Sequence, residues 1–339
     1  MEINKIDKSN MRQVIVESPN QLKKGLELVF DWYLKDIKHG ENFSNVVVCG
    51  IGGSVLAVEV LNAFTKTSIP VYIHRDYGLP SVASEKSLII CISYSGNTEE
   101  TLSALQEATS KKFRITCISS GGKVEKLCTN NDIPLIIIPS GIQPRCAIGY
   151  MFSALAKILI NEGIIQDCTA EILETSKKLA AINPALEKQG EKLAKKLVKK
   201  IPIVYSSNTF KAVAKIWKIK FNENSKIPAF YNYFPELNHN EMVGYTGLKK
   251  LGTKNFYVLI LQDSTNHPRI LKIMKLTADI IKKSGANVEV IPIQEGSLLF
   301  KIFSSLLLGD WVSYYVAIEN DIDPTPVKMV EEFKELMQK

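Results

Sequence analysis

The sequence predicts an α/β fold made of two subdomains, each a parallel sheet flanked by helices. Compact apolar runs bounded by Gly, Ser or Asn alternate with amphipathic stretches, and this alternation begins a second time after a Lys- and Ala-rich region. Strands buried on both faces have continuous apolar sequences, and parallel strands need crossover helices between them. The 339 residues suffice for two ordinary domains. We expect an N-terminal subdomain at residues 1–165, beginning with a helical segment, and a C-terminal subdomain at 166–339.

In the N-terminal subdomain the apolar runs predict five strands. They are expected at 45–50 (NVVVCG), 70–74, 87–93 (SLIICIS), 114–119 (RITCIS) and 135–139, with helices at 54–64, 99–110 and 148–162. The C-terminal subdomain repeats the pattern. Its strands are expected at 201–206, 255–262 and 287–293, and its helices at 210–222, 268–284, about 298–318 and 326–337.

Charge and hydropathy predict a folded, soluble protein. Lys and Arg number 42 against 35 Asp and Glu, a surplus that is mild for a dedicated nucleic-acid binder. The densest basic stretch, 188–200, has the spacing of a solvated helix face, with a polyanion patch as the alternative. No stretch approaches 18 unbroken apolar residues, and MEINKIDKSN lacks the layout of a secretion signal. We therefore expect a cytoplasmic protein that binds neither nucleic acid nor membrane.

The six cysteines are spread through the chain without the close pairs of a zinc knuckle or a redox dithiol. Cys49, Cys91 and Cys117 lie inside apolar runs. We expect them to be small buried side chains in a reducing compartment.

The first strand is followed by a glycine-rich turn, GIGGS. It begins like a dinucleotide fingerprint, but Val55 stands where the third glycine is required, which argues against a nicotinamide or flavin site. Gly52 and Gly53 still allow a ligand to approach the backbone closely, and Ser54 adds a hydroxyl at the start of the helix. We expect Ser54 to bind the phosphate of the substrate, and the backbone of Gly52 and Gly53 to contact the substrate.

A second turn, SYSGNTEET at 93–101, is more specific. It places the hydroxyls of Ser93, Ser95 and Thr98 around a glycine at the start of a helix, without a lysine. A helix cap would explain only one of these hydroxyls, and the ending of a Walker nucleotide loop is missing. The turn therefore predicts a site for a single phosphate group, such as that of a sugar phosphate.

SYSGNTEET after a strand, with GIGGS one unit earlier, resembles the sugar isomerase (SIS) domain family. Three further stretches, GIQPRCAIGY at 141–150, NENSKIPAFYNYFPELNHNE at 222–241 and the C-terminal DPTPVKMVEEFKEL, extend the resemblance. Together they closely resemble the bifunctional phosphoglucose/phosphomannose isomerases, in the same order from about Asn45 to the end. The resemblance implies two SIS-type subdomains and no cofactor.

Such enzymes interconvert glucose 6-phosphate or mannose 6-phosphate with fructose 6-phosphate by moving a proton between C1 and C2 of the opened sugar. The resemblance makes Glu223 the base, a task that suits a partly buried carboxylate. It makes Arg145 the cation for the enediolate, since a guanidinium stays charged. The alternatives are a surface salt bridge for Glu223 and a structural, carbonyl-capping role for Arg145.

By the same resemblance, His239 opens the sugar ring and Lys334 lies near it. Histidine exchanges protons near neutral pH, whereas a lysine on a Lys- and Glu-rich helix usually faces water. We expect no metal, because His239 with Glu236 and Glu241 is a poor zinc set. The remaining histidines are expected at the surface or as caps: His39, His74 and His267.

The resemblance also implies a homodimer in which His239 is supplied to the neighbouring subunit's site. The segment 227–245 is too long for a tight loop and too apolar to be left in water, so an isologous interface would cover it. Supply of His239 within its own subunit is the alternative. The alternative functions are a sugar-phosphate-binding regulator, which would carry a helix-turn-helix, and an amidotransferase-coupled synthase, which would need a glutaminase domain.

Overall fold

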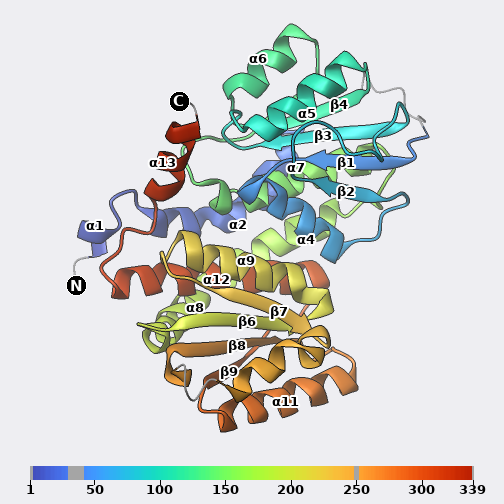
Figure 1. Ribbon diagram of the computed structural model, residues 1–339. Helices are drawn as coiled ribbons and strands as arrows, with labels where there is room; N and C mark the ends of the chain where they lie inside the picture. The colour runs from blue at the N-terminus through green and yellow to red at the C-terminus, as the bar shows by residue number, and fades with distance from the viewer. Residues whose placement is uncertain (1–2, 30–41, 248–251, 338–339) are drawn as a thin grey trace. The chain divides into compact units, whose positions relative to one another are not determined.

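The computed structural model describes residues 3–29, 42–247 and 252–337, and its contacts divide the chain into two compact units (Figure 1). The N-terminal unit is Glu17–Ala180. The C-terminal unit begins at Ala181 and includes the described residues up to Val16, so the division lies within α8 (Thr169–Leu197). The boundary expected between residues 165 and 166 lies just before this helix and stays a prediction.

The first residues join the C-terminal unit through buried polar contacts. The carboxylate of Asp7 accepts the backbone N–H groups of Met11 and Arg12 at the start of α2 (Met11–Glu27) and the hydroxyl of Tyr314 at 3.1 Å. Arg12 donates two hydrogen bonds to Glu187 of α8. These residues are far apart in sequence, so local patterns gave no sign of the grouping.

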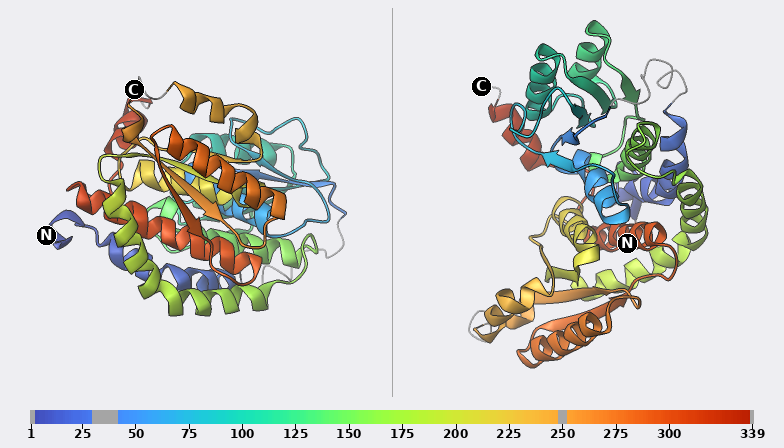
Figure 2. Two further views of the ribbon diagram at one scale, coloured as in Figure 1. Left: turned by 90° about the horizontal axis from the view of Figure 1, so that it is seen from below. Right: turned by 90° about the vertical axis from the view of Figure 1, so that its right-hand side faces the viewer.

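The N-terminal unit contains a five-stranded parallel sheet in the order β2-β1-β3-β4-β5. Its strands are β1 (Asn45–Cys49), β2 (Val71–His74), β3 (Ser87–Ser93), β4 (Arg114–Ser119) and β5 (Leu135–Ile137). One face is covered by α5 (Glu99–Ser110) and α6 (Gly122–Asn130). The helices α4 (Leu56–Phe64) and α7 (Ile148–Asn161) pack together across the sheet from them (Figure 2).

The cysteines expected to be buried pack beneath α5 and α6. Cys49 pairs in register with Cys91, and Cys91 with Cys117, on one face of the sheet. Hydrogen bonding to the neighbouring thiol of Cys91, together with burial, raises the pKa of Cys49 far above its ordinary value. All six cysteines are free thiols, and the expectation that these three are buried is confirmed.

The C-terminal unit contains a four-stranded parallel sheet in the order β7-β6-β8-β9. Its strands are β6 (Ile201–Ser207), β7 (Phe230–Phe234), β8 (Phe256–Gln262) and β9 (Asn287–Pro292). Its helices are α1 (Ile3–Ile6), α9 (Lys211–Glu223), α11 (Pro268–Lys283), α12 (Leu298–Glu319) and α13 (Lys328–Met337). Short 3₁₀ helices complete the chain: η1 (Gly52–Val55) and η2 (Pro144–Cys146) in the first unit, and η3 (Asn208–Phe210), η4 (Glu236–His239), η5 (Glu241–Thr246) and η6 (Thr253–Asn255) in the second.

The two faces of the C-terminal sheet are covered by different helices. On one side α9 packs on α12, where the indole N–H of Trp217 donates to the carbonyl of Ser305 at 2.8 Å. On the other side α11, η4 and η5 enclose a core that contains Tyr205, Leu237 and Tyr245. The predicted α/β fold of two parallel sheets flanked by helices is confirmed.

Most predicted elements agree with the structure to within two or three residues, but the strand β7, the helix α6 and the part of α8 before residue 188 were not predicted. FYNYF in β7 is aromatic and partly exposed, and GKVEKLCTN in α6 is short. The basic stretch 188–200 is a solvated face of α8, as predicted, and its Lys195 and Lys196 form ion pairs with Glu191 and Glu289.

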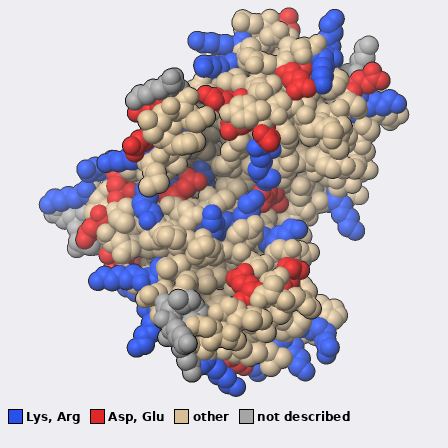
Figure 3. Space-filling view, in the orientation of Figure 1, with Lys and Arg blue, Asp and Glu red and all other residues tan. Residues whose placement is uncertain are grey.

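Charged side chains of both signs are interspersed over the face of the molecule shown in Figure 3. The most apolar long helix is α12, which still carries Lys301, Asp310 and Glu319. Within the described part of the chain, no helix combines the length and the hydropathy that crossing a membrane requires.

Candidate active site

The turn after β1 packs directly on the loop that carries Arg145. Gly52 has a φ of +61°, and a Cβ on Gly53 would lie 2.8 Å from the backbone nitrogen of Arg145. Only glycine allows this approach. The structure therefore brings Gly52, Gly53 and Arg145 together, although more than ninety residues of sequence separate the glycines from the arginine.

The turn after β3 gathers the predicted hydroxyls. Ser93 is buried and donates its hydroxyl hydrogen to Thr98 Oγ1 at 2.9 Å, whereas Ser95 is exposed. Thr98 precedes α5 but makes no side-chain cap bond to it. The first N–H groups of α5 therefore have no cap from this residue, which is the condition under which a helix start can bind an anion.

Gly96 shapes this turn. Its φ is +67°, and a Cβ there would lie 1.7 Å from the carbonyl oxygen of Gly121, in the turn after β4. The carbonyl of Gly96 accepts the N–H of Val124 at 3.0 Å, and the hydroxyl of Ser120 donates to the carbonyl of Tyr94 at 2.5 Å. The turn after β4, SSGG, thus supports the turn after β3. It was not predicted, although its position at the end of the next strand was a usable signal.

Tyr94 links three parts of the site. Its backbone N–H donates to the hydroxyl of Ser54 at 3.0 Å, which joins the β1 and β3 turns. Its own hydroxyl donates to the carbonyl of Pro139 at 2.9 Å and accepts the N–H of Ile142 at 3.2 Å, in the segment leading to Arg145. Burial raises the pKa of Tyr94, so the phenol remains a donor. Ser54 is buried here, with its oxygen used as an acceptor.

Arg145 is held in the interior, with 1% of its surface exposed. Its Nη1 donates to Gln143 Oε1 at 3.3 Å. On its other side, Gln21 of α2 donates to the carbonyl of Cys146 at 2.8 Å and accepts the N–H of Gly149 at 3.2 Å. Gln21 therefore fixes the start of α7 beside the arginine. Sequence reasoning missed it, since nothing local pairs residue 21 with residue 146.

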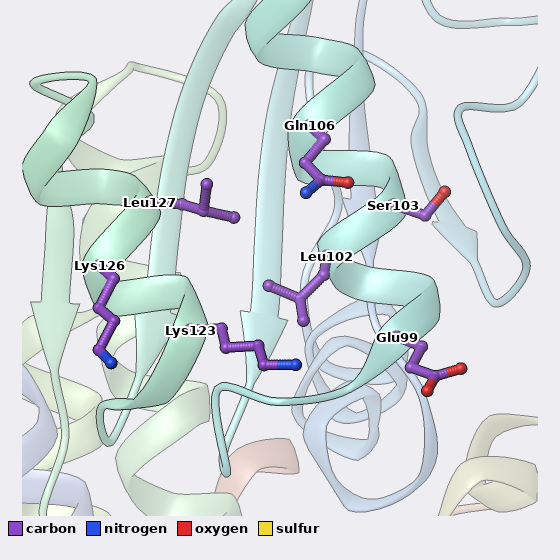
Figure 4. Close-up of a pocket in the computed structure, with 7 residues that line it drawn as sticks. All are labelled: Glu99, Leu102, Ser103, Gln106, Lys123, Lys126 and Leu127. Carbon is purple, nitrogen blue, oxygen red and sulfur yellow. The ribbon is translucent and has the colours of Figure 1, made fainter. Parts of the chain in front are cut away.

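An open groove of about 410 Å³ lies between α5 and α6, outside these turns (Figure 4). Leu102 and Leu127 point toward one another across it, and Lys123 lies at the end near the turns. Its lining includes none of the predicted site residues. We assign the site to the turns instead, because the donors for an anion converge there.

Glu223 is the last residue of α9 and is half-buried. The residues after it are fastened to α12: Asn224 Nδ2 donates to Ser313 Oγ at 2.9 Å, and Ser225 Oγ donates to the Ser313 carbonyl at 2.6 Å. Lys226 donates to the carbonyls of Glu223 and Pro324. The helix end that carries this carboxylate is therefore rigidly held within its unit.

His239 and Lys334 are both exposed. His239 ends η4, and Lys334 lies on α13, of which no residue is buried. Glu236 accepts from Asn240, and Glu241 from Tyr205 and Asn232. Among the residues that the structure describes, these side chains do not form a metal-binding cluster.

The other histidines are not among the predicted site residues. His267 caps α11 by accepting the N–H of Arg269 on Nδ1 at 3.2 Å, as predicted. His74 ends β2, and His39 lies outside the described residues.

The predicted site residues thus form two sets. The N-terminal unit contains Gly52, Gly53, Ser54, Ser93, Ser95, Thr98 and Arg145. The C-terminal unit contains Glu223, His239 and Lys334. The first set can hold an anion, and the second can exchange protons.

Comparison with known proteins identifies relatives over nearly the full length. A family model described as the bacterial phospho-glucose isomerase C-terminal SIS domain matches residues 186–337. A bifunctional phosphoglucose/phosphomannose isomerase of Caldicellulosiruptor bescii is 38% identical, covering 96% of this chain and 98% of the relative. One from Aquifex aeolicus is 33% identical, with coverages of 96% and 99%. The solved structure of a hypothetical protein from Thermus thermophilus shares the fold, with a TM-score of 0.74 at 13% identity over 96% of this chain and 89% of that one.

Proposed function

The chain belongs to the family of bifunctional phosphoglucose/phosphomannose isomerases, and we propose that its two units divide the reaction between phosphate binding and proton transfer. It is an isomerase that interconverts glucose 6-phosphate and mannose 6-phosphate with fructose 6-phosphate. The relatives match nearly the whole chain and are named as enzymes, which favours catalysis over the alternative of a sugar-phosphate-binding regulator. These substrates suggest a role in glycolysis and gluconeogenesis.

The phosphate binds at the turn after β3. The observation that carries this proposal is the convergence, within one unit, of the hydroxyl-lined β3 turn, the glycines after β1 and the buried Arg145. Ser95 and Thr98 supply hydroxyl donors, and the N-terminal end of α5 adds its dipole. Gly52 and Gly53 let the sugar approach the backbone.

The proton moves between C1 and C2 on the carboxylate of Glu223. In the aldose-to-ketose direction, Glu223 takes the C2 proton and returns it to C1, while the hydroxyl proton on O2 passes to O1. The enediolate formed between the two steps carries negative charge. Arg145 stabilises that charge, because a guanidinium remains protonated throughout. The braced end of α9 supports this role, since a mobile carboxylate would lose the alignment that proton transfer needs.

His239 opens the ring in the active site of a neighbouring subunit. Its side chain is exposed, whereas the flanking Leu237 and Tyr245 are buried in its own unit. Phe230 on the edge strand β7 is 54% exposed and Val243 is 64% exposed, which suits an isologous interface. We propose a homodimer with His239 shared across it, and Lys334 near the sugar ring. Buried free thiols are compatible with a cytoplasmic location.

The experiment that tests this function is a coupled assay of fructose 6-phosphate formation from each aldose phosphate, with and without a chelator. We expect turnover of glucose 6-phosphate and mannose 6-phosphate without added metal or nucleotide, because every proposed group is a side chain. Loss of activity on chelation that zinc restores would contradict the mechanism.

A further inference from the structure

His239 is exposed, yet the chain on both sides of it is tightly held. Leu237, two residues before it, is fully buried, and Asn238 Nδ2 donates to Thr277 Oγ1 of α11 at 2.7 Å. On the other side, Asn240 Oδ1 accepts the N–H of Glu241, and its Nδ2 donates to Glu236 Oε1 at 2.9 Å. Hydrogen bonds therefore hold the chain on both sides of the exposed His239.

The strongest of these restraints is the carboxylate of Glu241, both of whose oxygens are bound. Oε1 accepts the hydroxyl of Tyr205 from the central strand β6, and Oε2 accepts Nδ2 of Asn232 from β7. The hydroxyls of Tyr205 and Tyr245 lie 2.7 Å apart in the interior. Because Tyr205 donates its hydroxyl hydrogen to the carboxylate of Glu241, Tyr245 is the donor in the hydrogen bond between the two tyrosines. Glu241 thus attaches the chain next to His239 to two strands and to the core.

The tyrosines favour this arrangement over a wide pH range. Burial raises the pKa of Tyr205 far above its ordinary value, and burial also raises that of Tyr245. Both phenols therefore stay protonated and continue to donate. A charged acceptor with neutral donors gives hydrogen bonds stronger than those between neutral groups.

We propose that Glu241, held by Tyr205, Asn232 and Tyr245, is the positioning residue of His239, a role that rests on the ring-opening function proposed above. A proton-transferring group must be held to within about 0.5 Å of its working geometry, and a displacement of about 1 Å costs on the order of 100-fold in rate. His239 is exposed on its own unit, so within its own subunit the backbone around it must supply that precision. Glu241 fixes the backbone two residues away.

The same sheet offers a matched control. Tyr257 of β8 donates to Glu289 Oε2 of β9 at 2.8 Å, a tyrosine–glutamate bond like that of Tyr205 but on strands that carry no predicted site residue. Replacing Tyr257 by Phe removes a comparable hydroxyl from the unit without touching the His239 segment.

The test is a double-mutant cycle on kcat for fructose 6-phosphate isomerisation. We expect Glu241→Gln and Tyr205→Phe each to lower kcat about 10- to 100-fold with KM nearly unchanged. In a His239→Ala background we expect neither substitution to lower kcat further, because the group they position is already gone. Tyr257→Phe should change kcat less than about twofold in both backgrounds. Thermal melts and circular dichroism check that each variant is folded.

Failure of the positioning role of Glu241 and failure of the ring-opening role of His239 would give different results. If His239→Ala is strongly impaired but Glu241→Gln still lowers kcat by the same factor in that background, Glu241 acts only on the fold and the positioning role is refuted. If His239→Ala retains the kcat of the parent enzyme, the ring-opening role itself fails; any loss caused by Glu241→Gln then does not pass through His239, and the positioning role is refuted with it.

Discussion

The turn after β3 in the N-terminal unit and the turn after β8 in the C-terminal unit occupy equivalent places in their sheets, yet they are filled differently. Each strand lies beside the first strand of its sheet, on the side opposite the second, where α/β folds bind ligands. The β3 turn presents hydroxyls and an uncapped helix start. The β8 turn contains the carboxylate of Asp263, and its helix, α11, is capped by His267.

Asp263 supplies the β8 turn with an anion of its own. Its carboxylate accepts Lys301 Nζ at 2.8 Å, the hydroxyl of Thr265 at 2.8 Å and the N–H of Thr265 at 3.1 Å. Lys301 and Asp263 are both buried. The donors that a phosphate would use are therefore already occupied. Equivalent topology gives the two units the same location for a site, and the side chains favour the first as the phosphate site that we propose.

The largest expected effect tests whether His239 acts in the active site of a neighbouring subunit. Glu223→Gln subunits should be inactive and His239→Ala subunits strongly impaired, but refolded together they should recover about a quarter of wild-type activity. With random pairing, half of the dimers are mixed, and each mixed dimer has one intact site if His239 acts across the interface. Activity of verified mixed dimers decides the point: no recovery would mean that His239 serves its own subunit.

The second prediction concerns the loss of the Asp263 carboxylate, the internal anion of the β8 turn. Asp263→Ala leaves Lys301 buried without its carboxylate and should lower the free energy of unfolding by about 3 to 5 kcal/mol. Adding Lys301→Met should restore most of that loss, and KM for fructose 6-phosphate should change little in either variant. Denaturant unfolding and steady-state kinetics measure both quantities. A large rise in KM would show that the β8 turn takes part in substrate binding after all.

The third prediction addresses the β3 turn. Ser95→Ala and Thr98→Ala should each weaken sugar-phosphate binding by about 1 to 2 kcal/mol, the contribution of one hydrogen bond to a charged group. That corresponds to a rise of about 5- to 30-fold in Kd, measured by calorimetry. Ser264→Ala in the β8 turn is the control and should leave Kd unchanged. If Ser264→Ala raised Kd as much as Ser95→Ala or Thr98→Ala, the contrast between the two turns would be refuted.

The smallest effect concerns pH. Burial by itself raises the pKa of Asp263, but the hydrogen bonds from Lys301 and Thr265 outweigh it and lower that pKa below its ordinary value. A lowered folded-state pKa contributes stability above the unfolded-state value of about 3.9, and this contribution is lost as the pH falls through the folded-state value. Relative to the Asp263→Ala/Lys301→Met variant, the parent should therefore lose stability only below about pH 4. If the stability difference between the parent and this variant were instead lost between about pH 7 and pH 5, this assignment would be wrong.

The sequence was sufficient for the parts of the fold that local patterns determine. Central strands such as β3 and β4 were predicted because they are continuous apolar runs, and the β3 turn because three hydroxyls surround Gly96. The strand β7 was missed, since its partly exposed sequence FYNYF lacks the continuous aliphatic run of a buried strand.

The supports of the site could not be predicted, because they join residues that are distant in sequence. Gln21 beside Arg145, Tyr94 beside Ile142 and Tyr205 beneath Glu241 become neighbours only when the sheets assemble. Nothing in the sequence near any of these residues identifies its partner. Pairing of this kind follows from the order of strands and helices in space.

The most direct test of the division between binding and proton transfer is to measure both on Glu223→Gln. The amide keeps the shape of the side chain but cannot accept the C2 proton. We predict that this variant binds fructose 6-phosphate with a Kd close to that of the parent by calorimetry, while its isomerase activity disappears. Retention of more than a few per cent of the activity would show that Glu223 is not the base.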